Sequence, residues 1–162
     1  MLAACGHSSG GAASSGQSQQ SRDATAARKT AELVDPDMVT AVSSAHSTTP
    51  INMKFKLASR PSVGTALQLT VVLIPAADAN ISRIYVSFQP VDGLQLQTDR
   101  TLDIRSPDAG QPIEQQLSLV PQQSGVLTLN ATVMVDMDGS SLSRSYSIPV
   151  IVSDNLSPPH SP

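Results

Sequence analysis

The stretch GVLTLNATVMVDMDGSSLSRSYSIPVIV, residues 125–152, predicts two long β-strands folded back on each other. Apolar side chains recur in it at the period of two that is typical of a half-buried strand. On the first strand they are Leu127, Leu129, Ala131, Val133 and Val135, and on the return strand Tyr146, Ile148, Val150 and Val152. Between them, Asp138-Gly139 is a dipeptide that accepts the positive φ angles of a tight turn. The stretch is therefore a β-hairpin.

Pro149 interrupts the return strand with a residue that has no N–H to donate. We therefore expect this strand to lie at a sheet edge or to contain a bulge at the proline. The backbone of an edge strand can pair with a strand from another protein. Ser147, Pro149 and Ile151 are accordingly the candidate interaction residues.

Similar alternation, punctuated by turn-forming residues, continues upstream from residue 53. The expected strands cover residues 53–57, 67–74, 81–89, 94–96, 102–104 and 113–120. With the hairpin they make seven or eight strands without an intervening helix, which predicts an all-β, immunoglobulin-like β-sandwich over residues 51–152. Residues 153–162 are polar and proline-rich, as in a disordered tail.

Residues 6–50 have the composition of a flexible stalk. Gly, Ser, Ala and Gln dominate residues 6–20 and offer too little apolar surface to fold. Closer to the sandwich, Asp35 is placed to cap a short helix that starts at Pro36, with Met38, Val39 and Val42 on one side. A continued disordered stalk up to Pro50 is the alternative.

Overall composition argues against several classes of binding protein. The chain has 162 residues, of which 10 are basic and 13 acidic, for a net charge of −3. Aromatic residues make up 2% of it and tryptophan is absent, so it lacks the stacking surfaces that single-stranded nucleic acids and most sugars require. We expect no nucleic-acid partner.

The inventory of reactive side chains also argues against catalysis. The three histidines, His7, His46 and His160, fall outside the expected strands, so a histidine general base or metal site within the sandwich is excluded. Asp136 and Asp138 have the spacing of a calcium loop but lack its remaining ligands, which favours a hairpin turn. We expect no catalytic residue, metal or cofactor.

Charged residues alternate in sign between Asp99 and Arg105. The four are Asp99, Arg100, Asp103 and Arg105. Such a short mixed cluster is typical of a solvated strand edge and not of a binding site.

Cys5 is the only cysteine and follows Leu2-Ala3-Ala4. This tetrapeptide resembles the lipobox of bacterial lipoproteins, in which the cysteine becomes the lipid-modified first residue after cleavage, so residues 1–5 read as the remnant of a signal peptide. Gly6 replaces the aspartate that retains enterobacterial lipoproteins in the inner membrane, which implies the outer membrane. If Met1 is the true start, only four residues precede the cysteine and a cytoplasmic protein is the alternative.

The sandwich resembles immunoglobulin-like accessory domains of Gram-negative envelope lipoproteins. The resemblance covers residues 53–152 and rests on Phe55-Lys56-Leu57-Ala58, Val63-Gly64, Asp92-Gly93-Leu94, residues 119–125 and Ser147-Ile148-Pro149-Val150. It implies a non-enzymatic lipoprotein, anchored at Cys5 and facing the periplasm, that binds another envelope protein. The alternatives are a module that binds a small ligand or assists an enzyme, and a structural spacer.

Overall fold

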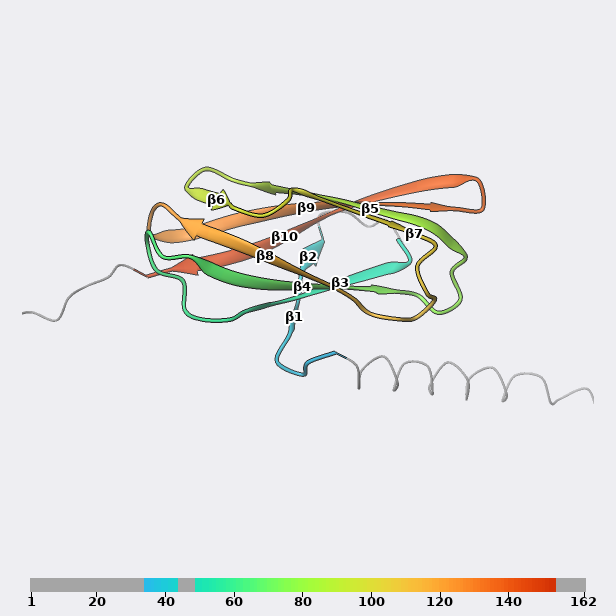
Figure 1. Ribbon diagram of the computed structural model, residues 1–162, viewed down its shortest axis with the longest axis horizontal. Helices are drawn as coiled ribbons and strands as arrows, with labels where there is room; N and C mark the ends of the chain where they lie inside the picture. The colour runs from blue at the N-terminus through green and yellow to red at the C-terminus, as the bar shows by residue number, and fades with distance from the viewer. Residues whose placement is uncertain (1–33, 44–48, 154–162) are drawn as a thin grey trace, which may run out of the picture.

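The computed structural model describes residues 34–43 and 49–153 (Figure 1). The predictions about Cys5, about residues 6–33 of the stalk and about residues 154–162 of the tail lie outside these residues. So do the three histidines.

Two five-stranded antiparallel sheets form the molecule (Figure 1). Sheet 1 contains, in spatial order, β1 (Val39–Thr40), β3 (Ile51–Leu57), β4 (Leu67–Pro75), β8 (Ile113–Pro121) and β6 (Leu94–Leu96). Sheet 2 contains β2 (Val42–Ser43), β10 (Ser140–Val152), β9 (Gly125–Met137), β5 (Ile81–Pro90) and β7 (Thr101–Arg105). Among the described residues there is no helix. The predicted immunoglobulin-like β-sandwich is confirmed.

The core is an apolar layer between the two sheets. Alternate side chains of the long strands are buried in it, except at the beginnings of β8 and β10, and no polar or charged residue is buried among those described. The largest of the fully buried side chains include Phe88, Ile51, Met53, Leu69, Ile84, Leu117, Leu129 and Ile148. Burial of one such side chain contributes about 1.5–3 kcal/mol, so this layer dominates the stability of the fold.

Strands β9 and β10 form the predicted hairpin. They pair without a register shift over 13 residues each, from Met137 opposite Ser140 to Gly125 opposite Val152. The two turn residues, Asp138 and Gly139, have φ angles of 47° and 76°. Both angles are positive, as a two-residue hairpin turn of type I′ requires at its central residues.

Strand β10 has no bulge at Pro149 and is not the outermost strand of sheet 2, but β2 pairs only with Tyr146 and Ser147, so no strand of the described residues lies beside Pro149. Strand β10 lies between β2 and β9, and its register with β9 is unbroken. The N–H of Val91 donates to the carbonyl of Thr128, so the backbone groups of Thr128 face β5 and not β10. Pro149 is paired opposite Thr128. Its nitrogen therefore points away from β9, where no ladder bond is lost.

Residues 34–43 belong to the sandwich, so the predicted boundary at residue 50 is too late. The chain pairs with β3 of sheet 1 through β1, then with β10 of sheet 2 through β2. Ala41, between the two short strands, is only 4% exposed, and its N–H donates to the carbonyl of Met53 at 2.9 Å. This segment thus bridges the two sheets at one edge.

No helix starts at Pro36. The side chain of Asp35 accepts the N–H of Asp37 at 2.9 Å, and its carbonyl accepts the N–H of Met38 at 3.1 Å. These bonds close a turn, after which the chain enters β1. The aspartate caps the N–H groups that follow it, as predicted, but pairing with β3 replaces the next helical turn.

Tyr146 links the sheets with a buried hydrogen bond. Its side chain is on β10, is 3% exposed, and donates from its hydroxyl to the carbonyl of Ile51 at 2.6 Å. Beside it, the Arg144 guanidinium lies 5.3 Å from the centre of the tyrosine ring and donates to the Ser43 hydroxyl at 2.6 Å. The two side chains thus hold the start of β3 and the end of β2 against β10.

Replacing Tyr146 by Phe should lower the free energy of unfolding by about 1–2 kcal/mol, because the Ile51 carbonyl would lose its donor in a buried position. Urea denaturation, with the midpoint shifted and the slope unchanged, measures this loss. Tyr85→Phe is the matched control, since that ring lies on the outer face of sheet 2, and should change stability by less than about 0.5 kcal/mol. Equal losses in the two variants would refute the role of the Tyr146 hydroxyl.

Candidate functional site

The candidate sites are surface features of the sandwich. Within residues 34–43 and 49–153, no group of three or more His, Cys, Asp or Glu side chains is arranged to hold a metal ion. The same residues contain no helix long and apolar enough to cross a membrane. Three surface features are candidate binding sites: the outer edge of β10, the outer edge of β7, and a groove on the outer face of sheet 1.

The predicted interaction residues Ser147, Pro149 and Ile151 point to the outer face of sheet 2, but the edge beside them is interrupted. Ser147 is paired with Val42 of β2, so its backbone is not open to a partner. Two residues past Ile151, the N–H of Ser153 donates to the Pro61 carbonyl at 3.3 Å. Only Pro149 and Ile151 lie between these contacts, which is too short a stretch for strand addition.

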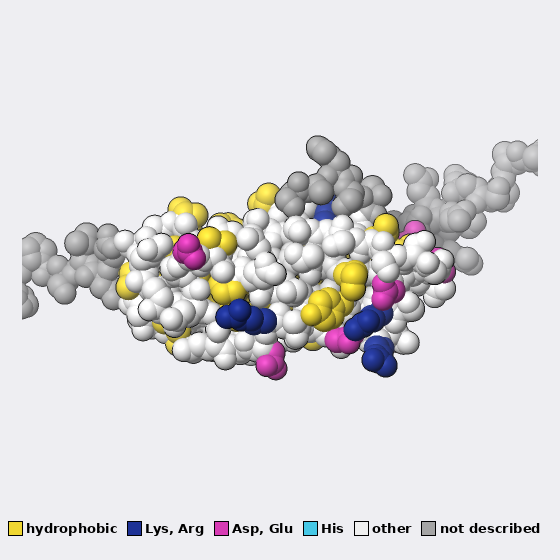
Figure 2. Space-filling model, turned by 90° about the horizontal axis from the view of Figure 1, so that it is seen from above, with side chains coloured by type: hydrophobic (Ala, Val, Ile, Leu, Met, Phe, Trp, Pro, Cys, Tyr) yellow, Lys and Arg dark blue, Asp and Glu magenta, His cyan; other side chains and the backbone are white. Residues whose placement is uncertain are grey.

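Exposed apolar side chains on the outer face of sheet 2 form small groups. Ile151 and Val126 are direct neighbours across β10 and β9 and are 67% and 70% exposed. Figure 2, which views the molecule from above, shows hydrophobic side chains in small separate groups, with basic and acidic side chains beside some of them. Exposed apolar residues in so small a group are normal for a monomeric domain.

Strand β7 offers a longer open edge. It is the outermost strand of sheet 2 beside β5, and no other strand of the described residues pairs with it. The Phe88 N–H donates to the Arg100 carbonyl at 2.7 Å, and the Ser106 N–H to the Ser82 carbonyl at 2.8 Å. By the alternation of an antiparallel ladder, Leu102 and Ile104 also bond to β5. The N–H and C=O groups of Thr101, Asp103 and Arg105 therefore point away from the sheet.

A two-bond ion pair fastens β7 to β5. The Arg83 guanidinium donates to both carboxylate oxygens of Asp103, from Nε at 2.8 Å and from Nη2 at 2.7 Å. The guanidinium hydrogen bonds hold the pKa of the Asp103 carboxyl below its usual range, and the carboxylate raises the pKa of Arg83. The sequence interpretation of Asp99–Arg105 as a solvated edge fits this position, but the partner Arg83 was not anticipated.

The groove on sheet 1 has a volume of about 410 Å³ and lies against residues 34–38. Its lining combines apolar and polar side chains: Val34, Asp35, Met38, Lys56, Thr70, Val72, Gln111, Pro112 and Glu114. Val72 points outward from β4 yet is only 4% exposed, so it forms the floor. The groove was missed at the sequence level because residues 34–38 were assigned to the stalk.

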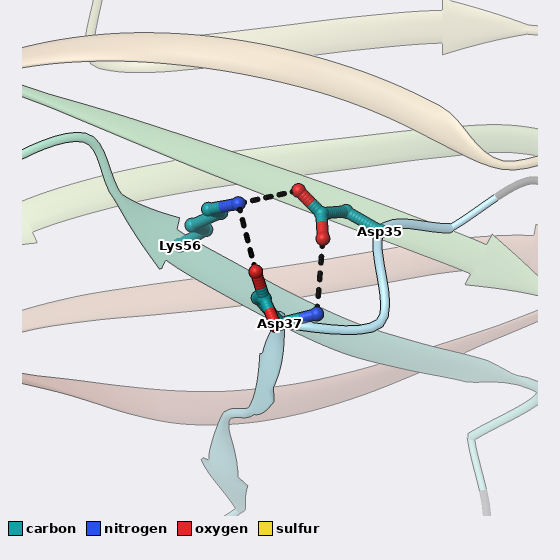
Figure 3. A network of polar contacts seen from close by, with 3 residues as sticks. All are labelled: Asp35, Asp37 and Lys56. Carbon is teal, nitrogen blue, oxygen red and sulfur yellow. Dashed lines mark hydrogen bonds and ion pairs between the residues drawn. The ribbon is translucent and has the colours of Figure 1, made fainter.

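Lys56 and Asp35, which both line the groove, form a polar network with Asp37 (Figure 3). The Lys56 ammonium lies 2.5 Å from Oδ2 of Asp35 and 3.7 Å from Oδ2 of Asp37. The hydrogen bond from Lys56, and next the Asp37 N–H, lower the pKa of the Asp35 carboxyl; the same pairing raises the pKa of Lys56. Because these groups are solvent-accessible, the pairing orients the turn and adds little stability.

Glu114 stands at the groove without a cationic partner. It lies on β8 directly opposite Val72. Its carboxylate accepts the side-chain N–H of Gln116 at 3.3 Å, and it takes part in none of the ion pairs of the described residues. Its negative charge is therefore available to a ligand.

Comparison with known proteins gives structural likenesses only. No family model and no curated protein sequence matches the chain. The GAE domain of GGA2p from Saccharomyces cerevisiae is similar with a TM-score of 0.48 and 12% identity, covering 69% of this chain and 96% of that one. AggA, the major subunit of aggregative adherence fimbriae type I from Escherichia coli, is similar with a TM-score of 0.40 and 11% identity, covering 68% and 99%. Likenesses this distant do not indicate what this chain binds.

Replacing Lys56 by Gln should raise the pKa of the Asp35 carboxyl toward the usual range of an aspartate. The turn-closing pair needs an ionised Asp35, so it is complete above the ordinary aspartate pKa and is lost as the pH falls through the lowered one. Side-chain carboxyl ¹³C shifts recorded from about pH 2 to 6 follow the titration. Lys54→Gln, two residues away on β3, is the control and should leave the pKa of the Asp35 carboxyl unchanged.

Proposed function

We propose that this chain is a non-enzymatic protein of the bacterial cell envelope whose β-sandwich binds another envelope protein by strand addition at β7. The open backbone of Thr101, Asp103 and Arg105 is the observation that carries the proposal. A partner strand would pair its own N–H and C=O groups with these three residues and extend sheet 2.

The β7 edge is organised for a specific partner. The Arg83–Asp103 pair holds β7 in place, so β7 would lose little conformational entropy when a strand binds. Charged side chains on an edge oppose indiscriminate pairing between sheets. Asp103 and Arg105, of opposite sign, would favour a partner strand with the complementary charges.

β7 replaces the Pro149 strand as the preferred docking edge. Between the pairing with β2 and the contact of Ser153, β10 offers one outward N–H, that of Ile151, because proline has none and Ser147 is paired with β2. On β7 three residues in alternation face outward. More hydrogen bonds can therefore form there.

The location in the envelope rests on Leu2-Ala3-Ala4-Cys5 and on the tether-like composition of the residues that follow. In the proposed arrangement, acyl chains on Cys5 anchor the protein, and the sandwich faces the periplasm from the outer membrane in preference to the inner one. One acyl chain alone gives marginal membrane binding, so stable attachment would need the multiple acylation typical of lipoproteins.

A small-ligand or enzyme-associated module is the second candidate function. The groove beside Lys56 and Glu114 favours it, since it combines an apolar floor with a few polar groups. A spacer role without a partner would leave both the β7 edge and the groove unused.

Replacing Arg105 by Pro should abolish binding at β7, because it removes an outward N–H while leaving the ladder with β5 intact. A photocrosslinking residue at position 101, in cells that express the native protein, should yield a crosslinked partner that disappears in Arg105→Pro. Arg105→Gln is the control: it keeps the backbone donor and should retain the crosslink. Loss in both variants would assign the effect to charge and count against strand addition.

Labelling with an alkyne palmitate analogue should modify the wild-type protein expressed from its native start. Cys5→Ser should remove the label, since no other cysteine is present. Unlabelled wild-type protein would rule out the anchor and leave the cytoplasmic alternative.

A further inference from the structure

We infer that the groove on sheet 1 binds an arginine side chain carried by an extended segment of a partner protein. This site lies on the opposite sheet from the β7 edge, so the inference does not depend on strand addition there. It rests on the apolar floor, the charge and the size of the groove.

The floor and walls suit an aliphatic stem. Val72 and Val34 are almost fully buried, so they close the base of the groove, and the accessible apolar surface comes from the partly exposed side chains beside them. Met38 and Pro112 complete the apolar part of the lining. The methylene groups of a long side chain can pack on this surface while its charged end stays at the rim.

The charge of the groove is complementary to a cation. Three carboxylates lie on or beside it, those of Asp35, Asp37 and Glu114, against one ammonium, that of Lys56, which leaves two net negative charges. Lys56 is already engaged by the two aspartates at the same side of the groove. Among the described residues, Glu114 has one hydrogen-bond donor, the neutral Gln116, and no cationic partner. A guanidinium at Glu114 would supply the charged, two-bond partner that this carboxylate lacks.

The size of the groove fits a side chain of a polypeptide. A volume of about 410 Å³ lies at the lower end of the range for small-molecule pockets. Thr70 and Gln111, also in the lining, can hydrogen-bond to the backbone on either side of the bound residue. The occupant is therefore one basic side chain with its flanking peptide groups.

The test uses the full chain and a fluorescein-labelled peptide, Ala-Leu-Arg-Leu-Ala amide, in fluorescence polarisation at low salt. The comparison peptide contains citrulline, which has nearly the shape of arginine but no charge. We expect the arginine peptide to bind at least about tenfold more tightly. Glu114→Gln should remove this difference, whereas Asp92→Asn, a carboxylate in an exposed turn outside the groove lining, should preserve it.

Several results would overturn the inference. These are equal affinity for the two peptides, equal effects of Glu114→Gln and Asp92→Asn, or amide chemical-shift changes that map to β7 and not to Thr70, Val72 and Glu114. A dimer in sedimentation that dissociates on Glu114→Gln would replace the partner with a second copy of the chain.

The Arg105→Pro variant separates this inference from the proposed function. It should bind the arginine peptide as the wild type does. If it loses the peptide while Glu114→Gln retains it, the peptide binds at β7, and the groove inference fails while strand addition stands.

Discussion

The continuous pairing of β9 with β10 is the constraint on which the rest of the structure depends. It aligns two strands of 13 residues so that the alternate side chains of both enter the core. Sheet 2 is assembled on this pair, since β5 and then β7 add to β9, and β2 adds to β10. Sheet 1 is held against it by apolar contact and by the Tyr146 hydroxyl. With Cys5 as the only cysteine, no disulfide within the chain can replace these contacts.

Residues 34–43 contribute both to the sandwich and to the groove on its surface. They cross from sheet 1 to sheet 2 around the buried Ala41, and in doing so they partly close an edge of the sandwich. The turn that precedes this crossing, held by Lys56, places Val34 and Met38 beside the outward face of β4. The groove exists because this turn packs on the sheet. Any change in the docking of the turn would therefore change the groove as well.

Two surfaces of the sandwich carry the proposed contacts with another molecule, and they differ in the groups that they offer. On β7 the backbone itself is available, and the Arg83–Asp103 pair keeps it in register. On sheet 1 the side chains supply the specificity, with an apolar floor beside the unneutralised Glu114. In the proposed function, the first surface would pair with an extended strand through its hydrogen-bonding groups, and the second would bind one side chain through its charge.

The sequence by itself determined the all-β class, the strands between residues 51 and 152, and the turn at Asp138-Gly139, because alternation and turn chemistry are local properties. Only the tertiary structure decided that the nitrogen of Pro149 points away from β9, since its direction follows from the register with Thr128. It also decided that residues 34–43 join the sandwich, because strands of two residues are too short to show an alternating pattern of apolar and polar side chains. Glu114 and Lys56 meet at one groove although 58 positions apart, and such proximity depends on strand order and not on sequence spacing.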